Sequence, residues 1–163
     1  YYSPIISLRQ KLNLHTNFRP CKSIKGNPLN YRDDIDLVIF RENTEGLYSG
    51  IEYYPLPGEL REVLIKYNPK MERFKDVPSN DIALSCRLIT KKASDSIIRQ
   101  GFEYAKKNKK KTVTIVEKAN VLRETSGIML REARKIAQEY PEIELQDTNI
   151  DAMLMWLIKN PQN

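Results

Sequence analysis

The spacing of apolar residues along the chain predicts four amphipathic helices. In each of them, apolar side chains recur three or four positions apart, which places them on one face of a helix. Proline follows two of these patterns and Asn13 closes the first, as expected where helices end. The expected helices cover residues 5–14, about three turns that begin at Ser94 or Asp95, residues 129–140 and residues 150–158.

Short runs of β-branched and other apolar residues between these helices predict strands. Residues 36–40 have the pattern of a buried strand, and residues 112–116 have the same character directly after a lysine-rich stretch. A third strand is expected over 143–145, between two of the helices. Because helices and strands alternate along the chain, we expect an α/β fold.

The middle third of the chain lacks both patterns. Residues 48–80 contain two glycines and four prolines, which favours an extended arm over a packed core. Strands are expected at its two ends, over 51–54 and 82–89. Tyrosines and leucines along this arm would expose apolar surface on a single copy, so we expect a homodimer that buries them.

The composition excludes several classes of protein. Hydrophobic residues make up 40% and charged residues 29% of the 163 positions, and the net charge is +6. These proportions are those of a folded domain with its own core. No apolar run approaches the roughly 18 residues of a membrane span, and the first residues do not form a secretion signal. We therefore expect no membrane partner and a cytoplasmic location, or the mitochondrial matrix in a eukaryote.

Lysine and cysteine patterns do not indicate a further site. Residues 106–111 carry five lysines where a helix is expected to end, and basic residues there complement the helix dipole. No aromatic residue lies among them for base stacking, so we expect no nucleic-acid partner. Cys21 and Cys86 lie far apart with only His15 to assist them, which indicates neither a zinc site nor a disulfide.

Three arginines are candidates for substrate binding. Arg41 directly follows a predicted strand, a position where α/β sheets present functional side chains. Together with Arg9 and Arg19 it could bind a substrate with several carboxylates, because each guanidinium can hold a carboxylate through two hydrogen bonds. The ordinary alternative is an ion pair, for instance between Arg41 and Glu42 or Glu45.

Three further residues have a catalytic and an ordinary interpretation. Lys118 follows a predicted strand and could transfer a proton, although a solvated lysine is commoner there. Tyr48, in a loop with two glycines, could be a general acid or a half-buried packing residue. Asp151 opens the last helix and could bind magnesium or simply cap the helix. The glycines form neither common phosphate-binding motif, and one histidine offers little for a hydrolase triad.

Several motifs, in order along nearly the whole chain, resemble one enzyme family. This is the family of metal-dependent, NAD(P)-linked β-decarboxylating dehydrogenases that act on isocitrate, homoisocitrate or 3-isopropylmalate. The residues that carry the resemblance are Leu8-Arg9-Gln10-Lys11-Leu12, Arg19-Pro20, Arg41-Glu42-Asn43-Thr44-Glu45-Gly46, Lys118-Ala119-Asn120 and Asp151-Ala152.

The resemblance implies a role for each candidate residue. Arg9, Arg19 and Arg41 would bind the substrate carboxylates, with Ser3 as a further substrate-binding residue. Tyr48 and Lys118 would be the acid/base residues, and Asp151 would be a ligand of Mg²⁺ or Mn²⁺. Asn120 would contact the nicotinamide of NAD or NADP. Some of these residues would act in the site of the neighbouring subunit. The metal would polarise the substrate's 2-hydroxyl group and make hydride loss and then CO₂ loss possible.

The resemblance also implies what this chain lacks. It would form one α/β substrate-binding and dimerisation domain, 1–163, with a protruding, β-rich, clasp-like arm over about 46–83. The cofactor-binding large domain and the remaining metal carboxylates would be absent, so the chain alone is expected to be inactive.

The expected whole enzyme oxidises isocitrate to 2-oxoglutarate and CO₂, a reaction of the tricarboxylic acid cycle. Homoisocitrate and 3-isopropylmalate dehydrogenases are the alternatives within the family. Ser3-Pro4-Ile5 is closer to homoisocitrate enzymes, whereas the long arm and Val116-Glu117-Lys118 favour isocitrate. A non-catalytic dimerisation module is the alternative from another class.

Overall fold

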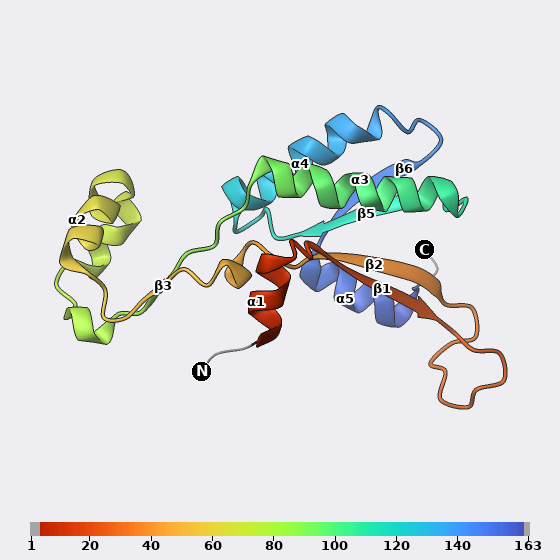
Figure 1. Cartoon of the computed structure of the whole chain (residues 1–163), viewed down its shortest axis with the longest axis horizontal. Coiled ribbons are helices and arrows are strands. Elements are labelled where there is room, and N and C mark those ends of the chain that lie inside the picture. The colour runs from red at the N-terminus through yellow and green to blue at the C-terminus, as the bar shows by residue number, and fades with distance from the viewer. Residues whose placement is uncertain (1–3, 162–163) are drawn as a thin grey trace. The chain divides into compact units, whose positions relative to one another are not determined.

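The structure, a computed structural model, describes residues 4–161 and divides into two compact units (Figure 1). The first, called here the α/β unit, comprises residues 1–45 and 89–163, and the second comprises Gly46–Leu88. The α/β unit contains α1 (Pro4–Lys11), β1 (Thr16–Lys22), β2 (Asp36–Glu42), α3 (Lys91–Lys107), β5 (Thr112–Glu117), α4 (Arg123–Ala137), β6 (Glu144–Asn149) and α5 (Ile150–Lys159).

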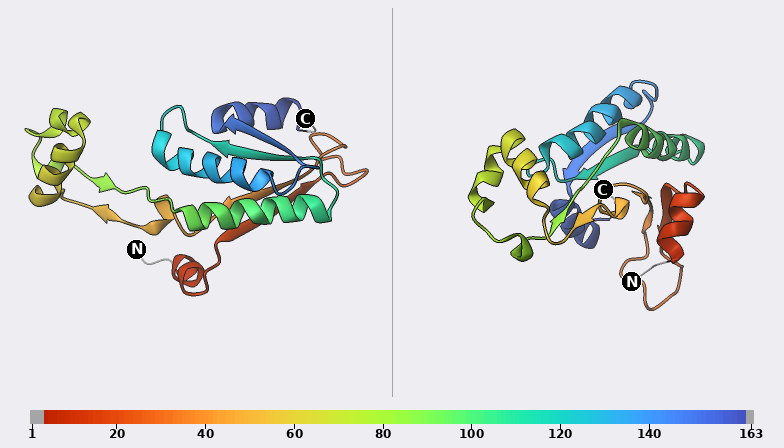
Figure 2. Two further views of the ribbon diagram at one scale, coloured as in Figure 1. Left: turned by 90° about the horizontal axis from the view of Figure 1, so that it is seen from above. Right: turned by 60° about the vertical axis from the view of Figure 1, so that its left-hand side comes forward.

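The strands of the α/β unit form two pairs. β1 and β2 are antiparallel, whereas β5 and β6 are parallel and are joined through α4. Figure 2 shows α3 and α4 side by side on one face of β5 and β6, with α5 on the other. The predicted α/β class is thus confirmed, and none of the described helices is long and apolar enough to cross a membrane.

The hydrophobic core lies between α3, α4 and the parallel strands. Phe102 of α3 and Ile136 of α4 are completely buried, and the ring of Phe102 stacks on Tyr140 with 5.1 Å between centroids. Ile97 and Ile115 complete the layer between helix and strand. Each of α3 and α4 therefore buries a single apolar face, as the helical spacing of their apolar residues predicts.

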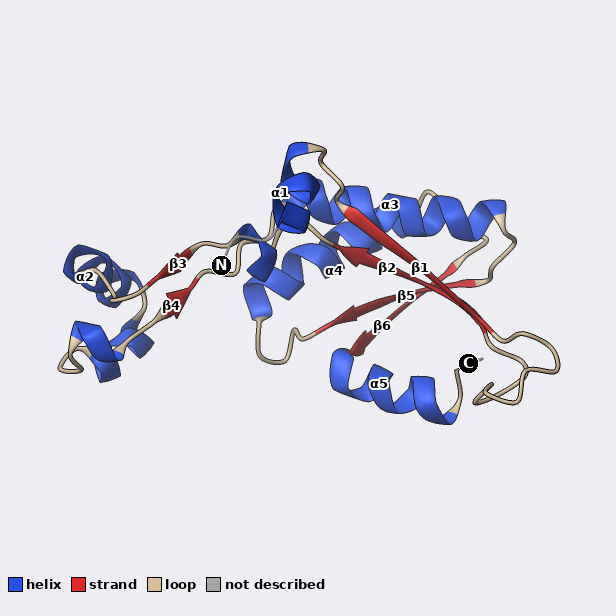
Figure 3. Ribbon diagram, turned by 60° about the horizontal axis from the view of Figure 1, so that its bottom comes forward, coloured by secondary structure: helices blue, strands red, loops and turns tan. Residues whose placement is uncertain are grey.

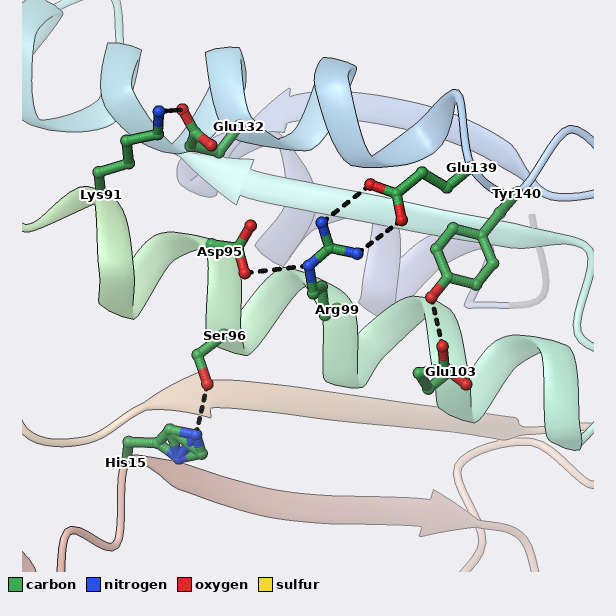
Figure 4. Close-up of polar contacts among 9 residues, drawn as sticks. All are labelled: His15, Lys91, Asp95, Ser96, Arg99, Glu103, Glu132, Glu139 and Tyr140. Atoms are coloured by element: carbon green, nitrogen blue, oxygen red, sulfur yellow. Dashed lines mark hydrogen bonds and ion pairs between the residues drawn. The ribbon is translucent and has the colours of Figure 1, made fainter.

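Polar contacts at the edge of this core hold α3 against the turn that follows α4 (Figure 4). The Arg99 guanidinium donates to both oxygens of Glu139, at 2.7 and 2.8 Å, and its Nε donates to Asp95 at 3.0 Å. This pairing holds the pKa of Glu139 below its ordinary value. The Tyr140 hydroxyl donates to Glu103, which raises the pKa of the tyrosine.

The antiparallel β1–β2 pair has two chemically different faces. Phe18 lies opposite Phe40 with 5.2 Å between the ring centroids, and both rings pack against Tyr104 of α3 at centroid separations of 5.4 Å. Because side chains alternate across a strand, the residues on either side of the two phenylalanines point away from α3. This outward face carries the polar residues described below.

Several expected boundaries differ from those in the structure. α3 begins at Lys91 rather than near Ser94, because the Thr90 hydroxyl accepts a hydrogen bond from Ala93 N and caps the helix. The helix has 17 residues, which is longer than three turns. β2 is half-buried rather than buried, with Ile39 40% exposed, because only one of its faces packs against α3.

The unit formed by Gly46–Leu88 is mainly helical. It contains α2 (Gly58–Tyr67), β3 (Glu52–Tyr53), β4 (Leu84–Ser85) and 3-10 helices at Leu47–Ser49, Pro69–Phe74 and Ser79–Asp81. The expectation of a β-rich arm is therefore wrong. Strong helix formers occupy 59–62, shortly after Pro57, and Arg61 donates to the carbonyl oxygens of Lys75 and Val77, so the chain folds into turns around a helix.

Candidate functional site

Two of the candidate arginines lie on the outward face of the β1–β2 pair. Arg41 lies directly opposite Asn17 in the strand register, and Arg19 follows two residues after Asn17 on the same face. The Nε of Arg19 donates a hydrogen bond of 3.0 Å to the Oδ1 of Asn17. The phenylalanines on the opposite face pack against α3, so the strand register places Arg19 and Arg41 on the same outward face, where Arg19 is exposed and Arg41 is half-buried.

The third candidate arginine approaches the same place from α1. Arg9 lines a shallow hollow of about 420 Å³ together with Asn17 and Asn43. Asn17 thus contacts Arg19, faces Arg41 and shares a hollow with Arg9. The structure therefore brings the three arginines around the first half of β1, an arrangement that suits a ligand with several negative charges.

Asn43 links the end of β2 to the residues just before β1. The side chain is only 5% exposed, and its amide nitrogen donates to the carbonyl oxygen of Leu14 at 3.4 Å. Its Oδ1 is buried and has no partner among the described residues. Asn43 thereby ties the end of β2 to the start of β1.

The two carboxylates beside Asn43 shape the backbone. Glu42 accepts hydrogen bonds from Thr44 N, the Thr44 hydroxyl and Glu45 N, with the shortest at 2.7 Å. Glu45 accepts from the backbone and hydroxyl of Thr90, at 2.7 and 2.6 Å. This run of residues after Arg41 therefore builds the turn that leaves β2 and fixes the start of α3.

A second group of candidate residues lies at the ends of the parallel strands. Lys118 follows the last residue of β5 and Asp151 lies in the first turn of α5, directly after β6. The Nζ of Lys118 forms an ion pair with Oδ2 of Asp151. Asn120 is exposed in the turn after Lys118, where the Lys118 carbonyl oxygen accepts from Val121 N and Leu122 N at 3.0 and 2.8 Å.

The arrowheads of β2, β5 and β6 point toward the same end of the α/β unit (Figure 3). Arg41 lies near the carboxyl end of β2, and Lys118 and Asp151 follow the carboxyl ends of β5 and β6. This is the edge at which open α/β sheets place their ligands. Arg41, Lys118 and Asp151 thus lie at or just beyond the carboxyl ends of their strands, in two separate two-stranded sheets.

Two candidate residues do not belong to these groups. Tyr48 lies in the 3-10 helix Leu47–Ser49 of the other unit, between Gly46 and Gly50, whose φ angles of 67° and 66° favour glycine. Ser3 lies outside the described residues. The predicted roles of both stay predictions.

The donor set for a metal ion is incomplete within the described part of the chain. No group of three or more His, Cys, Asp or Glu residues there could hold a metal. Asp151 provides one carboxylate, and that carboxylate is paired with a lysine. One such group does not fit a divalent cation, which takes about six oxygen ligands.

Comparisons with known proteins agree with the motifs. The family described as isocitrate/isopropylmalate dehydrogenase matches residues 2–163. The chain is 36% identical to NAD isocitrate dehydrogenase catalytic subunit 5 of Arabidopsis thaliana, a mitochondrial protein, over 96% of this chain and 35% of that protein. It is 35% identical to the chloroplastic 3-isopropylmalate dehydrogenase of Solanum tuberosum, over 96% of this chain and 37% of that enzyme.

A solved structure extends the likeness to three dimensions. The structure of isocitrate dehydrogenase from Methylococcus capsulatus has a TM-score of 0.80 and 40% identity, and the match covers 99% of this chain and 42% of that one. This chain therefore spans between about a third and two fifths of the length of these three relatives. Because the family match extends over almost every residue and includes the arginine, lysine and aspartate motifs, this chain belongs to the isocitrate/isopropylmalate dehydrogenase family.

Proposed function

We propose that this chain is the substrate-binding and dimerisation part of an NAD- or NADP-dependent isocitrate dehydrogenase that requires Mg²⁺ or Mn²⁺. Homoisocitrate and 3-isopropylmalate are the alternative substrates within the family. The observation that carries the proposal is the surface on which Arg19 and Arg41 flank Asn17, with Arg9 in the adjoining hollow. A tricarboxylate offers each guanidinium a carboxylate, and such charge-assisted pairs are among the stronger hydrogen bonds.

The remaining candidates would handle protons in the assembled enzyme. A lysine amine and a tyrosine hydroxyl are suitable groups for proton transfer, and Lys118 and Tyr48 would take those roles. The Lys118–Asp151 pair holds the ammonium group at the carboxyl edge of the strands until substrate and a second subunit are in place. We expect the isolated chain to bind substrate without turning it over, because it spans only part of its relatives and its described residues hold one candidate metal ligand.

The second subunit is a further part of the proposal. α5 exposes Leu154, Met155, Trp156 and Ile158, with Ile158 61% exposed, although the helix also packs on β5 and β6. Tyr54 and Tyr67 of the other unit are likewise more than 70% exposed. Apolar surface of this kind favours association with a second copy.

Isothermal titration with isocitrate, homoisocitrate and 3-isopropylmalate tests the substrate assignment. The tightest ligand identifies the substrate, and Arg41→Ala is expected to weaken its binding at least tenfold, because a charge-assisted hydrogen bond contributes roughly 1.5–3 kcal/mol. Arg131→Ala, on the exposed side of α4, is the matched control and should leave binding unchanged. Adding Mg²⁺ should change the affinity little, since the described residues hold no complete metal site.

A non-catalytic dimerisation module is the alternative, and the exposed face of α5 is the observation that favours it. The two proposals differ in their ligands. A folded, dimeric chain that binds none of the three acids would support the module and contradict the substrate-binding role proposed for this chain. Sedimentation measures the dimer, and the fluorescence of Trp156, the one tryptophan of the sequence, reports whether α5 enters the interface.

A further inference from the structure

We propose that Asn17 is a positioning residue, which turns the guanidinium group of Arg19 so that its terminal edge receives a substrate carboxylate. The proposal rests on the proposed function, since it concerns the same arginine surface. It adds a residue to which the motifs assign no role. The geometry of β1 and β2 supplies the argument.

The first step is the hydrogen bond between the two side chains. The Nε of Arg19 donates to Oδ1 of Asn17 at 3.0 Å, between residues two positions apart on one face of β1. A guanidinium group can bind a carboxylate through its Nε side or through its two terminal nitrogens. Because Asn17 occupies the Nε–H, only the terminal edge of Arg19 remains for a bidentate contact.

The second step is the place of Asn17 between two cations. Asn17 lies directly opposite Arg41, and facing residues in an antiparallel pair have their Cβ atoms about 4.5–5.5 Å apart. The amide is therefore hydrogen-bonded to the guanidinium group of Arg19, lies across the strand pair from Arg41, and lines the same hollow as Arg9. A single neutral side chain thus contacts Arg19, faces Arg41 and shares a hollow with Arg9.

The third step is the chemistry of the side chain. An amide accepts from Arg19 through its oxygen and keeps two N–H donors for an anionic ligand. An aspartate here would also accept from Arg19, but its charge would pair with the arginines and repel a carboxylate. Asparagine therefore orients the arginine and leaves the arginine's charge available to a substrate carboxylate.

The alternative is that Asn17 is an ordinary strand residue whose side chain happens to meet Arg19. The two interpretations differ in a spectroscopic signature. Nuclear magnetic resonance detects each arginine Nε–H, and Arg19→Lys identifies the Arg19 signal by its loss. If Asn17 holds the group, Asn17→Ala should speed hydrogen exchange at Arg19 Nε several-fold in the free protein.

Binding is measured on the same variants. Asn17→Ala should weaken tricarboxylate binding about three- to tenfold, because Arg19 loses its preferred orientation, and Asn17→Asp should weaken it more while keeping the slow exchange at Arg19. Asn27→Ala, in the connection between β1 and β2, is the matched control and should change neither quantity. Circular dichroism confirms that each variant is folded.

The outcomes separate this inference from the proposed function. Unchanged exchange at Arg19 in Asn17→Ala, or unchanged binding in that variant while Arg41→Ala loses it, would overturn the positioning role and leave the substrate proposal intact. If the wild-type chain binds no acid while exchange still depends on Asn17, the substrate assignment fails and the orientation of Arg19 by Asn17 stands.

Discussion

Lys118 and Asp151 pair across the gap between the end of β5 and the start of α5. The parallel register places Glu117 beside Asn149, so the residues that follow these two positions leave the sheet at the same level. The lysine and the aspartate lie far apart in the sequence. Their pairing is a consequence of the β5–α4–β6 connection, and it brings together two residues to which the family resemblance assigns separate roles.

The pair is expected to add little to stability. The Asp151 side chain is 70% exposed, and solvent-exposed ion pairs contribute only about 0.2–1 kcal/mol. A double-mutant cycle with Lys118→Met and Asp151→Asn, measured by urea unfolding, should give a coupling energy in that range that declines at high salt. A coupling above about 2 kcal/mol, or one insensitive to salt, would contradict the exposed pair described here.

The sequence motifs already identified the arginines, Lys118 and Asp151 as candidate site residues. Arg41 and Lys118 each follow an apolar strand pattern and Asp151 opens an apolar helical pattern, which are local signals. Local signals also predicted α4, β5 and α5 with shifted ends. What the sequence could not show is the register between β1 and β2, because pairing partners 24 residues apart are fixed only by folding.

β1 shows this limit most clearly. Pro20 and the charged residues beside it interrupt any alternation, so Thr16–Lys22 has no strand pattern. The strand forms because β2 pairs with it and Phe18 packs against Phe40 and Tyr104. Asn17, whose importance follows from that register, could not be identified without it.

The three aromatic rings are expected to hold the arginine surface in place. Phe40→Ala should lower the free energy of unfolding by about 1–3 kcal/mol, less than for a fully buried ring, because the side chain is only half-buried. Tyr67→Ala, where the ring is 76% exposed, is the matched control and should change stability by less than about 0.5 kcal/mol. The measurement is urea unfolding followed by circular dichroism.

The Phe40 variant should also lose affinity for a tricarboxylate, although no ligand contact is removed. Because Phe40 packs behind the strand, its loss frees β2 and Arg41 from α3. Titration at a temperature where the variant is still folded checks this. Unaltered affinity in a destabilised variant would mean that the arginine surface does not depend on the aromatic packing.

The Arg99–Glu139 pair predicts how stability changes in acid. Hydrogen bonds from Arg99 lower the pKa of Glu139 below its ordinary value of 4.5, against an opposing effect of burial. The folded protein therefore releases this proton more readily than the unfolded chain. The resulting stabilisation is present above pH 4.5 and disappears as the pH falls through the lowered pKa.

Glu139→Gln should remove this contribution. The wild-type protein is expected to be more stable than the variant at about pH 7, and the difference should shrink as the pH falls below 4.5 and through the lowered pKa of Glu139. Urea unfolding at a series of pH values measures the difference directly. A difference that stays constant over this range would show that the pair does not shift the pKa of Glu139.

Glu132 is the side chain in α4 whose replacement should stabilise the fold. It is 8% exposed, and one carboxylate oxygen is buried without a hydrogen-bond partner among the described residues. The other oxygen lies 3.5 Å from Lys91 Nζ, and that lysine is 67% exposed, so solvent screens the pair (Figure 4). A buried oxygen without a partner costs roughly 1–3 kcal/mol.

Replacing this carboxylate by an apolar group of similar length should recover part of that cost. Glu132→Met is expected to raise the free energy of unfolding by about 1 kcal/mol, because methionine favours helix and adapts to the same space. Glu62→Met, at an exposed position of α2, is the matched control and should be close to neutral. A loss of stability in Glu132→Met alone would mean that the ion pair with Lys91 outweighs the unpaired oxygen, and Lys91→Met should then be destabilising to the same degree.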